Sequence, residues 1–138
     1  MMSLVVRESA AAADDLAGAI AAFTGGAPMK TGRVKLDIAT LVDNGNTVPI
    51  AVSVESPMTP ADYVKTVAIF NERNPQRDVA IFNFTPASGR ASASTRIRLA
   101  TSQKLTAIAR MSDGSHWQHT VDVIVTLAAC IEGDGNGG

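Results

Sequence analysis

Cysteine, histidine and aromatic residues are scarce in this sequence. Its 138 residues include one Cys, two His, one Trp, one Tyr and four Phe. A single thiol excludes an internal disulfide and any zinc or iron–sulfur site built from several cysteines. So few histidines and aromatic rings also disfavour a metal centre or a stacking platform, and we expect no cofactor.

Charge and long apolar runs are scarce as well. The formal net charge of −1 gives no electrostatic reason to expect nucleic-acid binding, which depends on clustered Lys and Arg. No apolar run approaches the roughly 20 residues that a membrane-spanning helix needs. The sequence also lacks a Ser-His-Asp arrangement, a phosphate-binding loop and a helical His pair, so we expect no catalytic site.

The first thirty residues have the pattern of one helix. Ser9 can cap its start, and Gly25 with Gly26 can end it. Leu16, Ile20 and Phe23 follow the i, i+4, i+7 spacing of a single apolar stripe. A basic segment followed by a long apolar stretch is missing, so this is not a secretory signal. We therefore expect residues 1–31 to be a helical extension that packs on the domain or on a partner.

From residue 32 onward, apolar residues recur with a period of two, which is typical of strands with one buried face. Asn44-Gly45 is a strong hairpin signal. Seven strands with turn residues between them predict an antiparallel β-sandwich of the immunoglobulin-like class over residues 32–128, without the cysteine pair of antibody domains. The strands are expected around Val34–Ile38, Val48–Val54, Val67–Ile69, Val79–Phe84, Ala91–Leu99, Leu105–Met111 and Trp117–Leu127.

Several polar groups have structural interpretations. His116 and His119 are three residues apart, so on a strand they point to opposite faces and cannot readily share a metal ion. Asp43, Asn44 and Asn46 lack the carboxylates of a calcium loop and are interpreted as turn formers. The basic pair Arg96 and Arg98 is expected to be solvated or to face an acidic partner.

Cys130 stands where the last strand gives way to a glycine-rich tail. A thiolate is a strong nucleophile suited to reversible S–S chemistry, so a thiol on such an arm could hold a covalent cargo. Alternatively, Cys130 is a small core residue that ends the apolar run from Val123 to Ala129. The carboxyl-terminal arm is expected to comprise residues 129–138. Its glycine-rich part is formed by Gly133, Gly135, Asn136, Gly137 and Gly138.

Several segments, in order, resemble the SoxY family of sulfur carriers from thiosulfate-oxidising Sox systems. These segments are Asn44–Ile50, Val54–Thr59, Phe70–Pro75, Val79–Phe84, Thr95–Ala100 and Met111–Gly114. The resemblance implies an immunoglobulin-like sandwich, a heterodimer with SoxZ and a cysteine that holds sulfur intermediates on a Gly-Gly-Cys-Gly-Gly arm. It also implies partner loading, hydrolase and dehydrogenase enzymes, and export to the periplasm through a twin-arginine signal that this chain does not carry.

The arm departs from the family pattern. Continuous alignment from the last strand places Cys130 on the carrier position, with Ala128-Ala129 in place of two glycines. Alignment from the carboxyl terminus places Asn136 there, and the sulfur attachment point is then lost. We favour Cys130 because the strand register is continuous and it is the only thiol. Two alternatives stay open, a carrier-deficient SoxY-like binding subunit and a plain immunoglobulin-like interaction module.

Overall fold

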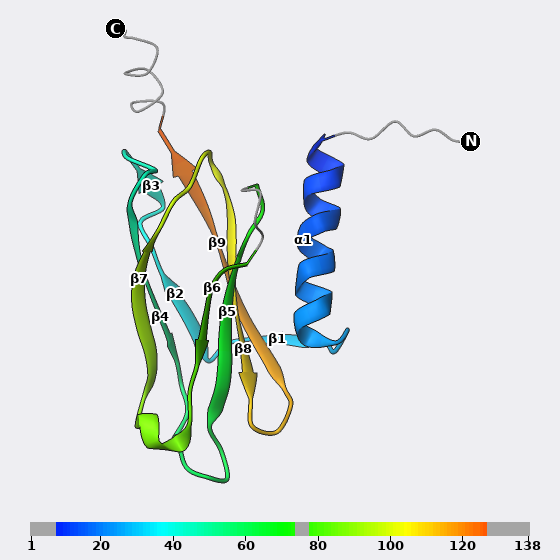
Figure 1. Ribbon diagram of the computed structural model, residues 1–138, viewed down its shortest axis with the longest axis vertical. Coiled ribbons are helices and arrows are strands. Elements are labelled where there is room, and N and C mark those ends of the chain that lie inside the picture. The colour runs from blue at the N-terminus through cyan, green and yellow to red at the C-terminus, as the bar shows by residue number, and fades with distance from the viewer. Residues whose placement is uncertain (1–7, 74–77, 127–138) are drawn as a thin grey trace, which may run out of the picture.

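Two β-sheets pack face to face, and one helix lies against the outer face of the larger sheet (Figure 1). The computed structural model describes residues 8–73 and 78–126. The elements, in chain order, are α1 (Glu8–Thr24), β1 (Met29–Thr31), β2 (Val34–Asp37), β3 (Leu41–Val42), β4 (Val48–Val54), β5 (Val64–Asn71), β6 (Asp78–Asn83), the short 3₁₀ helix η1 (Pro86–Ser88), β7 (Ala91–Ile97), β8 (Gln103–Met111) and β9 (His116–Val125).

The larger sheet has the strand order β1-β9-β8-β5-β6, and β3 also pairs with β9. The smaller sheet has the order β2-β4-β7. The pairings of the seven long strands are antiparallel, whereas the short β1 and β3 pair with β9 in parallel. The fold class predicted from the sequence, an all-β immunoglobulin-like sandwich with one helix, is confirmed.

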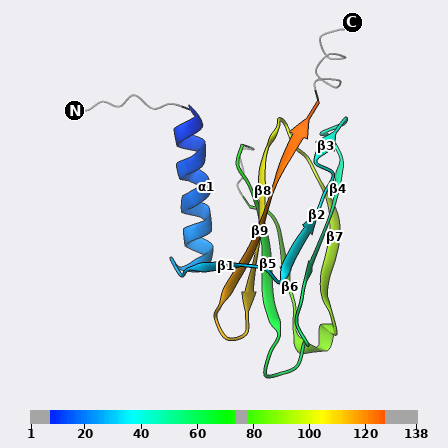
Figure 2. The ribbon, with the colours of Figure 1, turned by 180° about the vertical axis from the view of Figure 1, so that it is seen from behind.

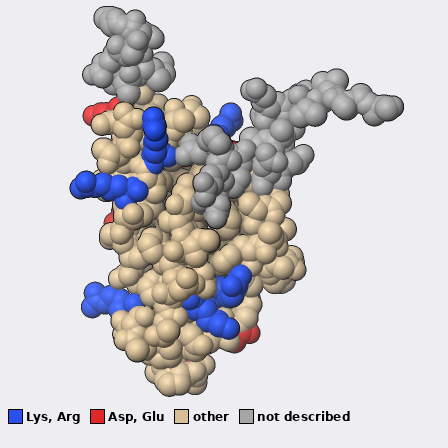
Figure 3. Space-filling model, in the orientation of Figure 1, with Lys and Arg blue, Asp and Glu red and all other residues tan. Residues whose placement is uncertain are grey.

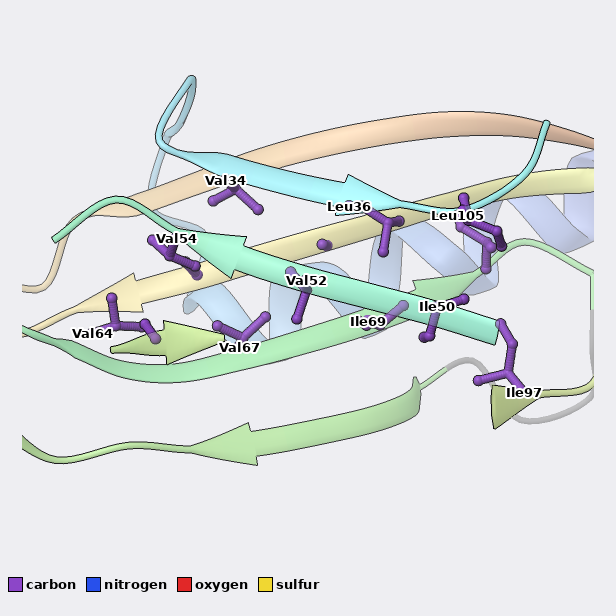
Figure 4. Packing of buried hydrophobic residues seen from close by; sticks show 14 of the residues in the cluster. Val34, Leu36, Ile50, Val52, Val54, Val64, Val67, Ile69, Ile97 and Leu105 are labelled. Carbon is purple, nitrogen blue, oxygen red and sulfur yellow. The ribbon is translucent and has the colours of Figure 1, made fainter. Parts of the chain in front are cut away.

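Alternating apolar residues from both sheets fill the space between them (Figure 4). On β4, Val48, Ile50, Val52 and Val54 are all buried, and the residues between them are exposed or half-buried. β5 differs because residues on both of its faces are buried. One face of β5 contributes to the sandwich core, and the other is covered by α1.

α1 packs through the stripe expected from the sequence. Leu16, Ile20 and Phe23 lie against a small apolar cluster on the outer face of the larger sheet, formed by Ala68, Phe70 and Ile108.

Arg110 fastens the carboxyl-terminal end of this helix to the sheet. Its Nη2 donates a hydrogen bond of 2.5 Å to the carbonyl oxygen of Phe23, and its guanidinium lies 4.2 Å from the centre of the Phe23 ring. A cation suits this position because the last carbonyl groups of a helix carry partial negative charge.

The chain passes from the larger sheet to the smaller one at a sharp corner between β1 and β2, best seen in Figure 2. Gly32 and Arg33 form this corner with φ angles of 113° and 62°. Arg33 tolerates its left-handed backbone because both its main chain and its side chain are held. Its carbonyl accepts from the N–H of Glu55 at 2.8 Å, and its Nε donates to the carbonyl of Glu55 at 3.0 Å.

One local expectation was wrong. The turn at Asn44-Gly45 exists, and the N–H of Asn46 donates to Oδ1 of Asn44 at 3.0 Å. The flanking strands do not form a hairpin, however, because β3 pairs with β9 whereas β4 pairs with β2 and β7. This turn therefore connects the two sheets.

Candidate functional site at the root of the arm

The predicted carrier residue and its arm follow directly on β9, the last strand. Cys130, Gly133, Gly135, Asn136, Gly137 and Gly138 lie outside the described residues. The structure describes the point from which this segment leaves the domain. We call residues 124–126 the arm root.

Hydrogen bonds on one side of β9 hold the arm root to the segment around β3. The N–H of Ile124 donates to the carbonyl of Thr40, and the N–H of Thr126 donates to the carbonyl of Val42, both at 2.8 Å. Two backbone bonds thus hold the first and the last residue of the arm root against the neighbouring segment.

Ser102 holds the residue between them. The N–H of Val125 donates to Oγ of Ser102 at 2.8 Å, and this hydroxyl donates back to the carbonyl of Val125 at 3.3 Å. A single side chain therefore satisfies both backbone groups of Val125. This contact lies just beyond the last paired residues of β8 and β9, Gln103 and Val123.

Gly45 lets the turn after β3 approach this region closely. Its carbonyl accepts from the N–H of Leu99 at 2.8 Å, and a Cβ at this position would collide with the carbonyl oxygen of Leu99 and press on the side chain of Val125. The arm root is thus supported by the turn at Gly45, by β3 and by Ser102. The domain presents the following twelve residues, 127–138, from a fixed point.

The two histidines lie on opposite faces of β9, as their spacing predicts. Nδ1 of His119 accepts a hydrogen bond of 2.9 Å from the N–H of Leu36, in the smaller sheet. His116 lies under α1 with its ring 6.0 Å from that of Phe23, edge to face, and neither ring nitrogen has a hydrogen-bond partner among the described residues. Burial lowers the pKa of His116 below its ordinary value of 6.5, and the nearby Arg110 lowers it further. His119 thus links the two sheets and His116 packs under α1, and neither residue belongs to the arm root.

The predicted basic pair lies at the end of β7. Arg96 and Arg98 are both exposed. Arg96 lines a shallow hollow of about 570 Å³ on the outer face of the smaller sheet, where Asp37 also contributes. A carboxylate and a guanidinium in one hollow offset each other's charge, so the hollow does not favour ligands of one charge sign strongly.

Charge on the visible surface is dispersed. In Figure 3 the Lys and Arg side chains lie apart over that face and do not merge into one basic patch. Over residues 8–73 and 78–126, no group of three or more His, Cys, Asp or Glu is arranged to hold a metal ion. Within the same part of the chain, no helix is long and apolar enough to cross a membrane.

Three residues that matter at the arm root were not singled out from the sequence. Ser102 lies in a loop without a motif, and Leu41 belongs to a strand of two residues, too short to show alternation. Ile124 looks like one more member of the apolar run at the end of β9. The pairing of β3 with β9 brings Leu41 beside Ile124, and both side chains are exposed.

The fold and the arm root define an immunoglobulin-like domain that presents a carboxyl-terminal, cysteine-bearing segment from its last strand. The family model "Sulfur oxidation protein SoxY" matches residues 20–130, and the chain belongs to this family. Its role is that of a sulfur-oxidation carrier and not of an enzyme. No protein of curated function matches the sequence.

Solved structures share the fold of this chain, and one of them is a SoxY protein. The sulfur carrier protein SoxY from Chlorobium limicola f thiosulfatophilum is 25% identical, with 83% of this chain and 94% of that chain covered and a TM-score of 0.70. Superoxide reductase (neelaredoxin) from Ignicoccus hospitalis is 19% identical, with 70% and 82% covered and a TM-score of 0.61. Superoxide reductase from Nanoarchaeum equitans is 17% identical, with 70% and 100% covered and a TM-score of 0.59. The likeness to the two reductases is one of fold alone.

Proposed function

We propose that this chain carries thiosulfate-derived sulfur covalently on Cys130 during Sox-type sulfur oxidation. In this proposal residues 129–138 are the carrier arm, a SoxZ-like subunit is the heterodimer partner, and the periplasm is the compartment. Loading, hydrolase and dehydrogenase enzymes act in turn on the sulfur that the arm presents.

One observation carries the proposal. The only thiol of the chain follows four residues after Thr126, whose N–H is hydrogen-bonded to Val42, and the family match ends at the same residue, 130. A thiol on a short tether from a fixed point reaches a partner's active site at high effective concentration. The fixed arm root supplies the anchor that such a mechanism needs.

The loading step forms one S–S bond. The Cys130 thiol gives its proton to solvent, and the thiolate sulfur bonds to the outer sulfur of thiosulfate. Two electrons leave in the process and pass to electron acceptors of the loading enzyme, such as two oxidised haem groups that take one electron each. The product is a cysteine S-thiosulfonate, from which partner enzymes remove the sulfonate and oxidise the remaining sulfur. The carrier itself needs no catalytic group for these steps.

A second candidate is a SoxY-like subunit that binds its partner but carries no sulfur. The observation in its favour is Ala128-Ala129, which replaces the glycines expected before a carrier cysteine. Each added Cβ widens the arm and restricts its backbone, which hinders entry into a narrow active-site channel.

Intact mass spectrometry separates these candidates. The full chain, with a SoxZ-like subunit, is incubated with thiosulfate, a Sox loading enzyme and an electron acceptor. We expect a mass gain of one thiosulfate on the native chain and none on Cys130→Ser. Removal of residues 131–138 should leave Cys130 chemically able to accept sulfur, whereas Asn136→Cys in the Cys130→Ser chain should restore little.

The opposite pattern identifies the carrier-deficient subunit. In that case the native chain gains no mass, and Asn136→Cys, which places a cysteine before Gly137 and Gly138, creates loading where there was none. Loading that persists in Cys130→Ser refutes the thiol mechanism, because the sequence contains no second cysteine.

A further inference from the structure

Two large apolar side chains are exposed side by side at the arm root. Leu41 is 61% exposed and Ile124 is 56% exposed, and they are register partners in the parallel pair β3–β9. Register partners project to the same face of a sheet. The neighbouring residues Val42 and Val123 are buried, so Leu41 and Ile124 point outward together. We call this pair the root patch.

Charged side chains border the root patch. Asp122 precedes Ile124 by two residues on β9 and therefore lies on the same face. Its Oδ1 accepts a hydrogen bond of 2.8 Å from Nζ of Lys104, and both side chains are well exposed. An apolar centre with a polar, solvated rim is the usual anatomy of a protein–protein contact.

The length of the arm limits where a partner can stand. Cys130 follows Thr126 by four residues, and an extended chain spans at most about 3.6 Å per residue, so the thiol stays within roughly 14 Å of the arm root. Thr126 itself follows Ile124 by only two residues. A protein whose active site holds the Cys130 sulfur must therefore bring its own surface up to the root patch.

We propose that the root patch is the docking surface for the enzymes that add sulfur to Cys130 or remove it. This inference rests on the proposed carrier function. The occupant is the apolar rim of the enzyme channel that receives the arm. Two side chains form a patch far smaller than a standard stable interface, which buries about 800 Å² on each partner, and this small size suits repeated short encounters.

The structure offers a matched control for testing this surface. Ile81, on the edge strand β6, is 51% exposed. It is paired in register with Ala68, which lies under α1, so it belongs to the same outer face of the larger sheet as Ile124. Ile124→Lys and Ile81→Lys thus make the same chemical change at similar exposure, one at the arm root and one on another strand.

The test measures how fast a loading enzyme transfers thiosulfate to Cys130 of the full chain, with its SoxZ-like subunit, at carrier concentrations below saturation. We expect Ile124→Lys and Leu41→Lys to slow loading about 5–30-fold, which corresponds to 1–2 kcal/mol of lost encounter energy. The effect should be on the half-saturating concentration of the carrier and not on the maximal rate. Ile81→Lys should load like the native chain, and iodoacetamide should alkylate Cys130 equally fast in all variants.

Four results would overturn the inference. Equal loading rates for Ile124→Lys and the native chain refute the docking surface while the carrier function stands. Loss of SoxZ-like subunit binding in Ile124→Lys shows that the patch is a subunit interface, and loss of self-association shows that a second copy occupies it. A native chain that takes up no sulfur refutes the carrier function, and the docking surface with it.

Discussion

The backbone N–H of Leu36 donates a hydrogen bond of 2.9 Å to Nδ1 of His119 and so joins the two sheets of the sandwich. β2 is an edge strand of the smaller sheet, and its other side pairs with β4. The histidine thus satisfies a backbone donor that the ladder leaves free. Because Nδ1 accepts, the proton of the neutral ring resides on Nε2.

His119→Ala should destabilise the fold by about 1–3 kcal/mol, since the N–H of the buried Leu36 loses its acceptor. Urea unfolding followed by circular dichroism measures this change. His119→Asn is the matched variant, because its Oδ1 can take the place of Nδ1, and it should lose clearly less stability than His119→Ala. Equal losses for the two variants would mean that ring packing, and not the hydrogen bond, is the important contribution.

Gly45 provides a second test of how the arm root is supported. In Gly45→Ala the new Cβ collides with the carbonyl oxygen of Leu99, a backbone atom that cannot move aside like a flexible side chain. We expect a loss of about 1–3 kcal/mol, as for other overpacked positions. Amide exchange at Val125 and Thr126 should also become faster, because the turn that supports them shifts.

Gly18→Ala is the control for that substitution. Gly18 lies within α1, and a Cβ there would meet no atom within 4 Å. Alanine in a helix interior is more favourable than glycine by about 0.5–1 kcal/mol, so this variant should be slightly more stable. Gly45→Ala as stable as the native chain would contradict the close approach of the turn to Leu99.

The fold could be predicted from the sequence where a strand is long enough to show alternation. All seven predicted strands are present, and the apolar stripe of α1 packs as its spacing indicates. β1 and β3, with three and two residues, could not be predicted because they exist only through their pairing with β9. The false hairpin at Asn44-Gly45 has the same cause, since a turn motif does not specify which strands pair across it.

The candidate site was predictable only in part. Cys130 stood out by its chemistry and its place in the chain. The supports around its tether come from contacts between residues far apart in sequence, such as Ser102 with Val125, and alternation carries no information about them. The burial of His116 could not be predicted from the sequence either, because the residue that covers it, Phe23 of α1, lies in a distant part of the chain.

His116 makes stability depend on pH. Its pKa is lowered in the folded state, chiefly by burial and also by Arg110, so below the ordinary value of 6.5 the unfolded chain binds more protons than the folded one. The stability linked to this group is fully present above that value and is lost as the pH falls below it. The urea midpoint should therefore drop between about pH 7.5 and about pH 5.5, the range in which histidine titrates.

Two variants test whether His116 causes this pH dependence of stability. His116→Phe removes this titrating group and its two unpartnered nitrogens, so its midpoint should drop clearly less than that of the native chain over this range. His119→Asn removes the other histidine, leaves His116 as the only one, and should retain the drop. A His116→Phe chain that retains the native pH profile would show that other groups cause it.

The reactivity of Cys130 distinguishes a carrier thiol from a core thiol. A thiol on an arm beyond the arm root is in contact with solvent, whereas a thiol that continues the apolar run of β9 into the core reacts only when the protein opens. We expect iodoacetamide to alkylate native Cys130 at a rate within about ten-fold of that in urea, with Cys130→Ser as the unlabelled control. A core thiol would instead be protected by the free energy of opening, which for a domain of this size is typically about 5–15 kcal/mol and slows labelling by several orders of magnitude. Protection that lasts for hours in native buffer would place Cys130 in the sandwich, because no partner is present in this experiment to cover it.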